Sequence, residues 1–361
     1  MAAEQEHLPN LDGLRTLAAF TVVFGHCQAV CAFPIGPDSS LQWLKRLLFE
    51  QAALGVQFFF VLSGFLITRI VLREQRREKG FDLRLFWLRR VLRIWPVYFL
   101  VVALGGLAAA TGWAAVAMPY NQWGLLLTFL ENFDLLHLLK QGLPYGHIVS
   151  VLWSVSIEEQ FYLIYPILLM LVPRRFYLML FSSIILASLR YKVLHSAGPE
   201  VGFHTFSQCY ELAIGCLLAL LTPQPPKWCT SLSPWFLLVP YGLALGQILR
   251  PEWPWIPYSL PWLFGLIVLD QAFCQRSWLQ TRRIPLVNWL GKFTYGIYSY
   301  HMVFALLVFH LMELQGTKPH TLVTYVFYVT AVSLCAVCFS LASYRWLERP
   351  CLRLKDRLRP Q

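Results

Sequence analysis

Long apolar stretches, separated by short and mostly basic polar segments, dominate the chain. A helix that spans a membrane needs about 20 mostly apolar residues, because no lipid-exposed backbone group can stay unpaired. On that criterion the sequence predicts about ten such helices. They are the segments 10–31, 52–72, 86–109, 150–172, 176–189, 206–222, 233–249, 257–274, 293–314 and 321–344. We therefore expect an all-α fold, a polytopic membrane protein with about ten transmembrane helices.

The basic residues are distributed unevenly between the two sides of these predicted helices. If the N-terminus is cytoplasmic, 23 of the 30 Lys and Arg residues lie in the inner connections and seven in the outer ones. Because an excess of positive charge marks the cytoplasmic side, we expect both the N-terminus and the C-terminus to be cytoplasmic. We divide the chain into a cytoplasmic N-terminus (1–9), a transmembrane domain (10–344) and a basic cytoplasmic tail (345–361).

Three further segments change this picture only in detail. The polar, acidic start of the chain has no basic n-region and no small-residue cleavage site, so we expect a retained first helix and not a signal peptide. The outer stretch 110–149 contains a semi-apolar piece, Trp123 to Phe133, that is too short to cross and is expected to be re-entrant or interfacial. The outer-loop residues Pro251 to Trp255 are typical of interfacial aromatic anchors.

The composition agrees with a membrane protein and excludes other classes. Hydrophobic residues make up 57% of the chain and charged residues only 14%, both far from the averages for soluble domains. The net charge of +11 lies in clusters between apolar stretches, so nucleic-acid binding is not the leading interpretation. The nine Cys residues, mostly within apolar runs, indicate neither a disulfide framework nor a zinc site. We expect no metal, because no HExxH-type motif is present.

Arg15 and His26 lie within the first predicted helix. Polar residues at membrane depth cost a few kcal/mol each, so both are functional candidates. Eleven residues of helix separate them, which places them on the same face and roughly 16 Å apart along the axis. We expect them to line one cavity, Arg15 near its cytoplasmic end and His26 past the middle. Alternatively, Arg15 snorkels to the lipid headgroups and His26 is a core histidine bonded to a carbonyl group.

Arg90 and Arg93 lie at positions i and i+3 near the start of the third predicted helix. Guanidinium groups match phosphate oxygens, so this face could hold a polyphosphate headgroup at the cytoplasmic mouth. The positive-inside bias alone explains most of the basic residues around them. It explains less well why these two continue into the apolar helix.

Glu158 and Glu159 are adjacent carboxylates in the fourth predicted helix, about 12 Å from the outer surface by the rise per residue. Adjacent helix positions point about 100° apart, so at most one of them faces a given partner. We favour Glu158, which has Ser154 on the same face; a structural interhelical bond is the alternative. Further candidates are Ser63, Gly64 and Thr68 in the second helix, where small residues permit close approach, and Tyr298, Ser299, Tyr300 and His301 in the ninth.

Together these segments resemble the acyltransferase 3 family of bacterial integral-membrane O-acyltransferases along nearly the whole chain. The resemblance rests on motifs in the family's order: Asn10-Leu-Asp-Gly-Leu-Arg15 with His26, the segment Gly55 to Thr68, the Arg-x-x-Arg of Arg90 and Arg93, Trp153 to Tyr162, Tyr295 to His301, and Trp346-Leu-Glu-Arg-Pro350. Each motif alone is weak, but their shared order makes coincidence improbable.

The resemblance implies a location in the bacterial inner membrane, ten transmembrane helices and a cytoplasmic acyl-CoA, most often acetyl-CoA, as donor co-substrate, with no permanently bound cofactor. His26 matches the family's proposed catalytic histidine. Arg15, Arg90 and Arg93 match basic residues tied to the donor or to the site architecture, and Glu158 matches an acidic position. Many relatives carry an additional extracytoplasmic esterase-like domain; only eleven residues follow Pro350, so a second transfer step on this chain is not expected.

These residues suggest a mechanism. Arg90, Arg93 and Arg15 would hold the CoA phosphates at the cytoplasmic mouth, with Ser63 and Gly64 on the donor path. His26 would take a proton from the acceptor hydroxyl as this attacks the thioester carbonyl, and a carboxylate such as Glu158 would orient the imidazole. A covalent acyl-histidine or acyl-serine relay is the alternative to direct transfer.

The expected acceptor is a sugar hydroxyl of a cell-surface or exported glycan, or of a lipid-linked saccharide, that enters from the outer side; the other expected partners are membrane lipids. A macrolide or another small glycoside is the alternative acceptor. A proton-coupled transporter or flippase would also bury Arg, His and Glu, but the sequence shows no two related halves. A non-catalytic subunit of a polysaccharide-export complex would need neither His26 nor Arg15.

Overall fold

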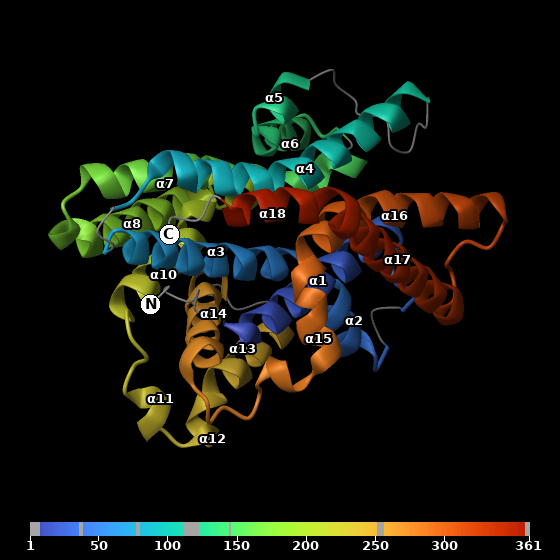
Figure 1. Ribbon diagram of the computed structural model, residues 1–361. Coiled ribbons are helices and arrows are strands. Elements are labelled where there is room, and N and C mark those ends of the chain that lie inside the picture. The colour runs from blue at the N-terminus through green and yellow to red at the C-terminus, as the bar shows by residue number, and fades with distance from the viewer. Residues whose placement is uncertain are drawn as a thin grey trace.

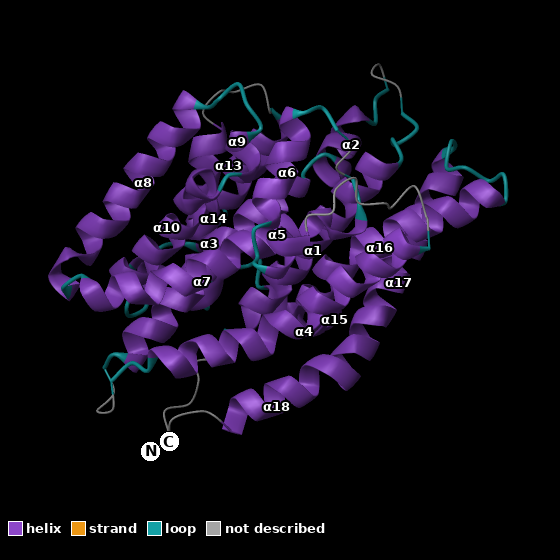
Figure 2. Cartoon of the chain, turned by 90° about the horizontal axis from the view of Figure 1, so that it is seen from above, coloured by secondary structure: helices purple, strands orange, loops and turns teal. Residues whose placement is uncertain are grey.

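The computed structural model describes residues 8–35, 39–76, 80–111, 123–143, 146–250 and 256–357. Within these ranges all regular structure is helical, with no strand (Figures 1 and 2). The longer helices are α1 (Pro9–Val30), α3 (Ala52–Glu74), α4 (Leu83–Ala110), α7 (Trp153–Leu171), α8 (Tyr177–Leu194), α10 (Thr205–Leu221), α13 (Val239–Leu249), α14 (Ile256–Phe273), α16 (Thr294–Leu314) and α17 (Leu322–Ser343). The shorter α-helices are α2 (Gln42–Phe49), α5 (Trp123–Leu127), α6 (Glu131–Lys140), α9 (Glu200–Phe203), α11 (Trp228–Ser231), α12 (Pro234–Leu237), α15 (Pro285–Leu290) and α18 (Arg349–Arg357).

Each of the ten predicted apolar segments coincides with a helix or, for 233–249, with the pair α12 and α13. Pro240 lies in the first turn of α13, a position where the missing N–H of proline is tolerated. By length and apolarity, five helical stretches of the described chain can cross a membrane: Gln42–Glu74, Leu83–Ala110, Arg174–Leu194, Pro285–Leu314 and Leu322–Leu354. The all-α membrane fold is thus supported, while ten crossings and cytoplasmic termini stay predictions.

Other predicted segments have mixed outcomes. The semi-apolar piece from Trp123 to Phe133 forms α5 and the beginning of α6. In the basic tail, a π-helical turn at Tyr344–Glu348 continues α17 into α18, which packs against α4. The aromatic outer loop Pro251–Trp255 lies outside the described residues, as do residues 1–7 and 358–361.

Two glycines set the closest helix contact in the fold. A Cβ on Gly64 of α3 would lie 2.0 Å from the carbonyl oxygen of Leu212 in α10, and a Cβ on Gly215 would lie 2.0 Å from that of Val61. The two helices therefore cross at backbone contact, as small residues allow in membrane bundles. Figure 1 shows α3 running beside α10.

The start of α1 is tied to the segment that follows α14. The Asn10 side chain donates to the carbonyl of Gln271 over 3.0 Å and accepts from the backbone N–H of Arg282 over 3.0 Å. Thr281 donates to the Asn10 carbonyl over 2.5 Å. A Cβ on Gly13 would lie 2.4 Å from the Cβ of Thr281, so only glycine fits there. This clamp fixes the helix that carries Arg15 and His26.

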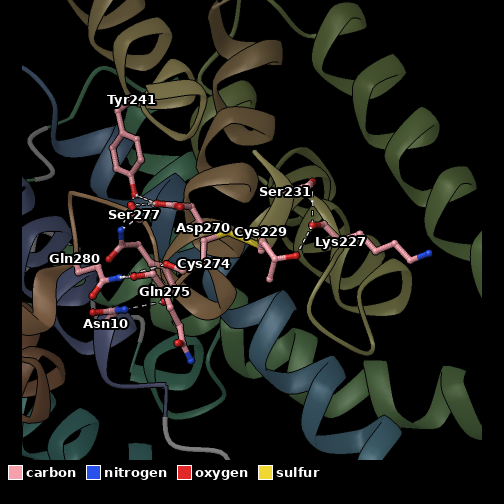
Figure 3. Close-up of a disulfide and its surroundings, with 12 residues drawn as sticks. Asn10, Lys227, Cys229, Ser231, Tyr241, Asp270, Cys274, Gln275, Ser277 and Gln280 are labelled. Atoms are coloured by element: carbon pink, nitrogen blue, oxygen red, sulfur yellow. Dashed lines mark hydrogen bonds between the residues drawn. A yellow bond between two sulfur atoms is a disulfide. The ribbon is translucent and has the colours of Figure 1, made fainter. Parts of the chain in front are cut away.

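Close to the clamp, Cys229 and Cys274 form a disulfide (Figure 3). The sequence indicated no disulfide framework, and it did not identify this single pair. The two residues are 45 positions apart, so their spacing gave no signal; they meet because the chain on either side of α12, α13 and α14 returns to one place. Next to them, the Asp270 carboxylate accepts hydrogen bonds from Tyr241 (2.7 Å) and Ser277 (2.8 Å).

Candidate active site

Two adjoining cavities lie between α1, α3 and α4. The first, here called the basic cavity, has a volume of about 400 Å³, and the second, the buried cavity, of about 210 Å³. The residues that line both are Arg15, Leu66, Ile70 and Arg93. The two cavities share these walls and therefore lie next to each other within the bundle; together they are here called the hollow.

The basic cavity is rich in guanidinium groups. Besides Leu8, Leu11, Leu72, Ala219 and Pro223, its lining includes Asp12, Arg15, Arg69, Arg73, Arg76 and Arg93. Asp12 forms an ion pair with Arg15, which leaves a large net positive charge around the hollow. Such a cluster matches a ligand that carries several phosphate groups.

Sequence reasoning missed the α3 arginines of this cavity. Arg69 and Arg73 stand at positions i and i+4 on one face of α3, and Arg76 lies two residues beyond its end. Arg69 donates to the carbonyl of Thr222 over 3.1 Å and lies over the Phe273 ring at 4.9 Å, which fixes its side chain. The i, i+4, i+7 spacing was the available signal, but the general positive-inside bias concealed it.

The buried cavity contains the predicted carboxylate. Ser63 donates to one oxygen of Glu158 over 2.5 Å, and Tyr162 donates to the other over 3.2 Å. Arg90 lines the same space, with its guanidinium group 5.7 Å from the centre of the Tyr162 ring. The structure thus brings Ser63, Glu158, Arg90, Arg93 and Arg15 together around one hollow, but Arg90 lines only the buried cavity and not the basic cavity, where the sequence predicts it to lie with Arg93.

Neighbours of these residues point elsewhere. Glu159 accepts from the indole N–H of Trp95 over 3.1 Å and lines neither cavity, whereas Glu158 lines the buried cavity. Gly64 faces α10 and lines neither cavity, so the prediction that it lies on the donor path is wrong: it is a packing residue. Thr68 bonds to the Tyr165 hydroxyl over 2.5 Å and is buried in the same helix contact.

His26 does not lie where the helix geometry placed it. It lines neither cavity; instead its Nδ1 lies 3.1 Å from Nε2 of His301, which is fully buried. The expectation that Arg15 and His26 line one cavity is therefore wrong for His26. The physical reason is the Tyr298 ring, which forms the wall of the buried cavity and contacts His301 at 5.8 Å between ring centres.

The expected partner of His26 also differs. Both oxygens of Glu158 are bonded to Ser63 and Tyr162, and in the described part of the chain no hydrogen bond joins Glu158 to His26. His301 takes that place. The segment Tyr295 to His301 stands out in the sequence, but nothing in it specifies which residue His301 meets.

The arrangement has a definite chemical capacity. Cations that fit phosphates surround one end of the hollow, a hydrogen-bonded carboxylate lies further in, and a half-buried imidazole lies beyond one aromatic ring. Imidazole is the side chain best suited to proton transfer near neutral pH. Among the described residues, no group of three or more His, Cys, Asp or Glu side chains could hold a metal ion. These features define a membrane protein, helical throughout the described residues, with an internal hollow lined at one end by guanidinium groups.

The family model of the acyltransferase domain matches residues 8–345, and the chain belongs to this family. Among curated proteins, the chain is 26% identical over 388 aligned positions to the protein named "Putative O-acetyltransferase" of Staphylococcus aureus (strain COL); the match covers 96% of this chain and 58% of that protein. It is 25% identical over 382 positions to the peptidoglycan O-acetyltransferase of Listeria monocytogenes, with coverages of 96% and 56%.

The chain thus spans little more than half the length of these curated relatives. No solved structure matches the chain.

Proposed function

We propose that this protein is a membrane O-acetyltransferase that moves an acetyl group from cytoplasmic acetyl-CoA to a sugar hydroxyl of a cell-surface glycan. One observation carries the proposal: the basic cavity adjoins the buried cavity, so a mouth that fits phosphate groups lies next to a largely apolar interior that contains Glu158. CoA has the matching form, a phosphate-rich head on a long thin arm that ends in a thioester.

The two cavities divide the donor between them. The phosphates fit the basic cavity, where Arg69, Arg73 and Arg93 offer bidentate guanidinium groups. The arm then passes Arg15 into the buried cavity, whose lining is largely apolar apart from Glu158, Ser63 and the arginines. The thioester at the end of the arm thereby comes to the Tyr298 wall, with His26 and His301 behind it.

The acceptor approaches from the opposite side. Arg15 lies near the start of α1 and His26 near its end, so a donor that enters beside Arg15 and an acceptor that reaches His26 need not share an entrance. In the orientation predicted by the basic residues, the end of α1 faces outward. A glycan or lipid-linked saccharide at the outer face of the bacterial inner membrane fits this geometry, and one of the relatives is named a peptidoglycan O-acetyltransferase.

A CoA-release assay tests the function. The protein in nanodiscs, given acetyl-CoA and a peptidoglycan or polysaccharide acceptor, is expected to release CoA and to produce an acetylated glycan detected by mass spectrometry. A His26→Ala variant should lose at least about 100-fold of this rate, since general-base catalysis contributes about that much, and should bind acetyl-CoA unchanged.

The matched control is His310→Ala, on the same helix as His301 but outside both cavities. Its rate should equal that of the wild type. Transport of acetyl-CoA or of glycan without formation of an ester would contradict the proposal and favour a transporter.

A further inference from the structure

His26 and His301 form a directed chain of hydrogen bonds. Nδ1 of His301 lies 2.5 Å from the carbonyl oxygen of Tyr298. Nδ1 of His26 lies 3.0 Å from the carbonyl oxygen of Val22 and 3.1 Å from Nε2 of His301. His301 is fully buried, whereas His26 is only half-buried. Of the two residues, His26 is thus the more exposed.

The two carbonyl groups fix the position of every proton in this chain. A carbonyl oxygen only accepts, so Nδ1 of His301 carries a hydrogen and its Nε2, in the neutral ring, is a lone pair. The same argument at Val22 places a hydrogen on Nδ1 of His26. That N–H then points at the lone pair of His301 as well, which accounts for the contact between the two rings. Nε2 of His26 is left unprotonated.

We propose that His301 is a positioning residue that holds His26 as a base with its free electron pair on Nε2. This inference rests on the proposed function. It gives His301 the role that a buried carboxylate has in a catalytic triad, to orient the imidazole and to stabilise the imidazolium that forms when a proton is taken up. In the described residues no carboxylate is bonded to His26, so the neutral ring of His301 supplies the acceptor.

The transfer step balances on these groups alone. Nε2 of His26 takes the proton of the acceptor hydroxyl while its oxygen attacks the thioester carbonyl carbon. As the tetrahedral species collapses, the carbon–sulfur bond breaks and the CoA thiolate takes the proton back from Nε2. Throughout the step Nδ1–H of His26 donates to His301 and Val22, so the ring keeps its orientation. The products are an ester and free CoA.

Three substitutions of His301 test its role. In His301→Gln the amide oxygen can take the place of Nε2 and still accept the hydrogen bond from His26. In His301→Asn the side chain is shorter, so its amide group extends only as far as the place of Nδ1. His301→Leu has no acceptor. We expect Leu and Asn to lower kcat about 10- to 100-fold with an unchanged KM for acetyl-CoA, and Gln to stay within a few-fold of the wild type. The expected loss of kcat is smaller than the loss caused by replacing the Asp of a Ser-His-Asp triad with Asn, because the carbonyl group of Val22 still accepts a hydrogen bond from His26.

The order Gln above Asn is the decisive comparison, because it separates positioning from packing. Equal rates for the Gln and Asn variants, or a wild-type rate for Leu, would overturn the proposal. His310→Leu, on the same helix, serves as the control for substitution of a histidine and should leave kcat unchanged.

A readout independent of activity separates this inference from the proposed function. In protein labelled with ¹⁵N-histidine, both His26 and His301 should carry a proton on Nδ1 and none on Nε2 near neutral pH. The opposite tautomer at either residue would overturn the inference even in an active enzyme. A wild type with the expected tautomers that makes no ester would refute the proposed function alone.

Discussion

Ser154 of α7 and Tyr298 of α16 share a hydrogen bond of 2.5 Å between their hydroxyl groups. The Tyr298 hydroxyl also donates to the carbonyl of Val151 over 3.2 Å. These bonds hold the aromatic ring in the wall of the buried cavity, with its centre 5.8 Å from that of the His301 ring. In the proposed reaction this ring shields the thioester from water.

Loosening that ring should uncouple CoA release from transfer. Tyr298→Phe keeps the ring but loses both hydrogen bonds, so the ring moves more freely and water reaches the thioester. We expect CoA release in the absence of acceptor to rise several-fold relative to release with acceptor, measured by thiol detection.

The control for this variant is Tyr300→Phe, on the same helix as Tyr298. This substitution loses a hydrogen bond of 2.7 Å to Ser343 of α17, but Tyr300 does not line the cavity. A wild-type ratio in Tyr298→Phe would show that the ring does not act as a barrier.

The arginines of α3 should determine donor affinity. A hydrogen bond to a charged group contributes about 1.5–3 kcal/mol, so Arg73→Ala or Arg76→Ala should weaken acetyl-CoA binding about ten-fold or more. Calorimetry or fluorescence titration at low salt measures this, since added salt screens the exposed part of the interaction.

Arg84→Ala provides the matched control, because this exposed arginine of α4 lies outside both cavities. If all three variants bind acetyl-CoA alike, the basic cavity is not the phosphate site.

The sequence predicted the helices well, because the length of an apolar segment is a local property. It predicted the site only in part. The spacing of Arg15 and His26 placed them on one face of α1, but it could not show that His26 meets His301, from a helix far away in the chain, and does not line the cavity. Similarly, nothing near Gly64 tells whether a small residue faces a ligand or the backbone of α10. Such contacts depend on which helices meet, and that is set by the whole bundle.

The crossing of α3 and α10 should tolerate no side chain at its centre. Gly64→Ala places a methyl group 2.0 Å from the Leu212 carbonyl oxygen, so the helices must move apart, at a cost of about 1–3 kcal/mol. A lowered thermal transition in detergent is the expected result.

For comparison, a Cβ on Gly242 of α13 meets no atom within 4 Å. Gly242→Ala should therefore leave the transition unchanged or raise it. A Gly64→Ala protein as stable as the wild type would show that the helices do not touch here.

Lys192 of α8 and Glu211 of α10 form a fully buried ion pair of 2.5 Å. Lys192→Met leaves the carboxylate buried without its partner, which should destabilise the fold by about 3–5 kcal/mol. The double variant Lys192→Met, Glu211→Leu should recover most of that loss, because no buried charge remains.

Lys318 and Glu313 offer a control at the same distance of 2.5 Å, with both side chains more than 40% exposed. Lys318→Met should not change the thermal transition measurably, since exposed pairs contribute little. A double variant of the buried pair that is no more stable than Lys192→Met alone would contradict this account.

The state of the Cys229–Cys274 pair should depend on the compartment. In the proposed orientation both cysteines face the cytoplasm, where thiols are kept reduced. Acid quenching of cells, followed by denaturation and maleimide labelling, should therefore modify all nine cysteines. Air oxidation of the purified protein should protect these two. Protection of the pair in freshly quenched cells would instead place this end of the bundle outside the cytoplasm.

The clamp at Asn10 holds α1 as one continuous rod from Pro9 to Val30. Arg15 at one position and His26 eleven residues later are thus kept at a fixed spacing of roughly 16 Å along the axis. In the proposed function this distance selects the donor: the thioester reaches the site near His26 only when the arm between the phosphates and the sulfur is long enough to span it. Truncated acyl thioesters that lack the nucleotide are not held at the basic cavity, so the enzyme would not align them in this way.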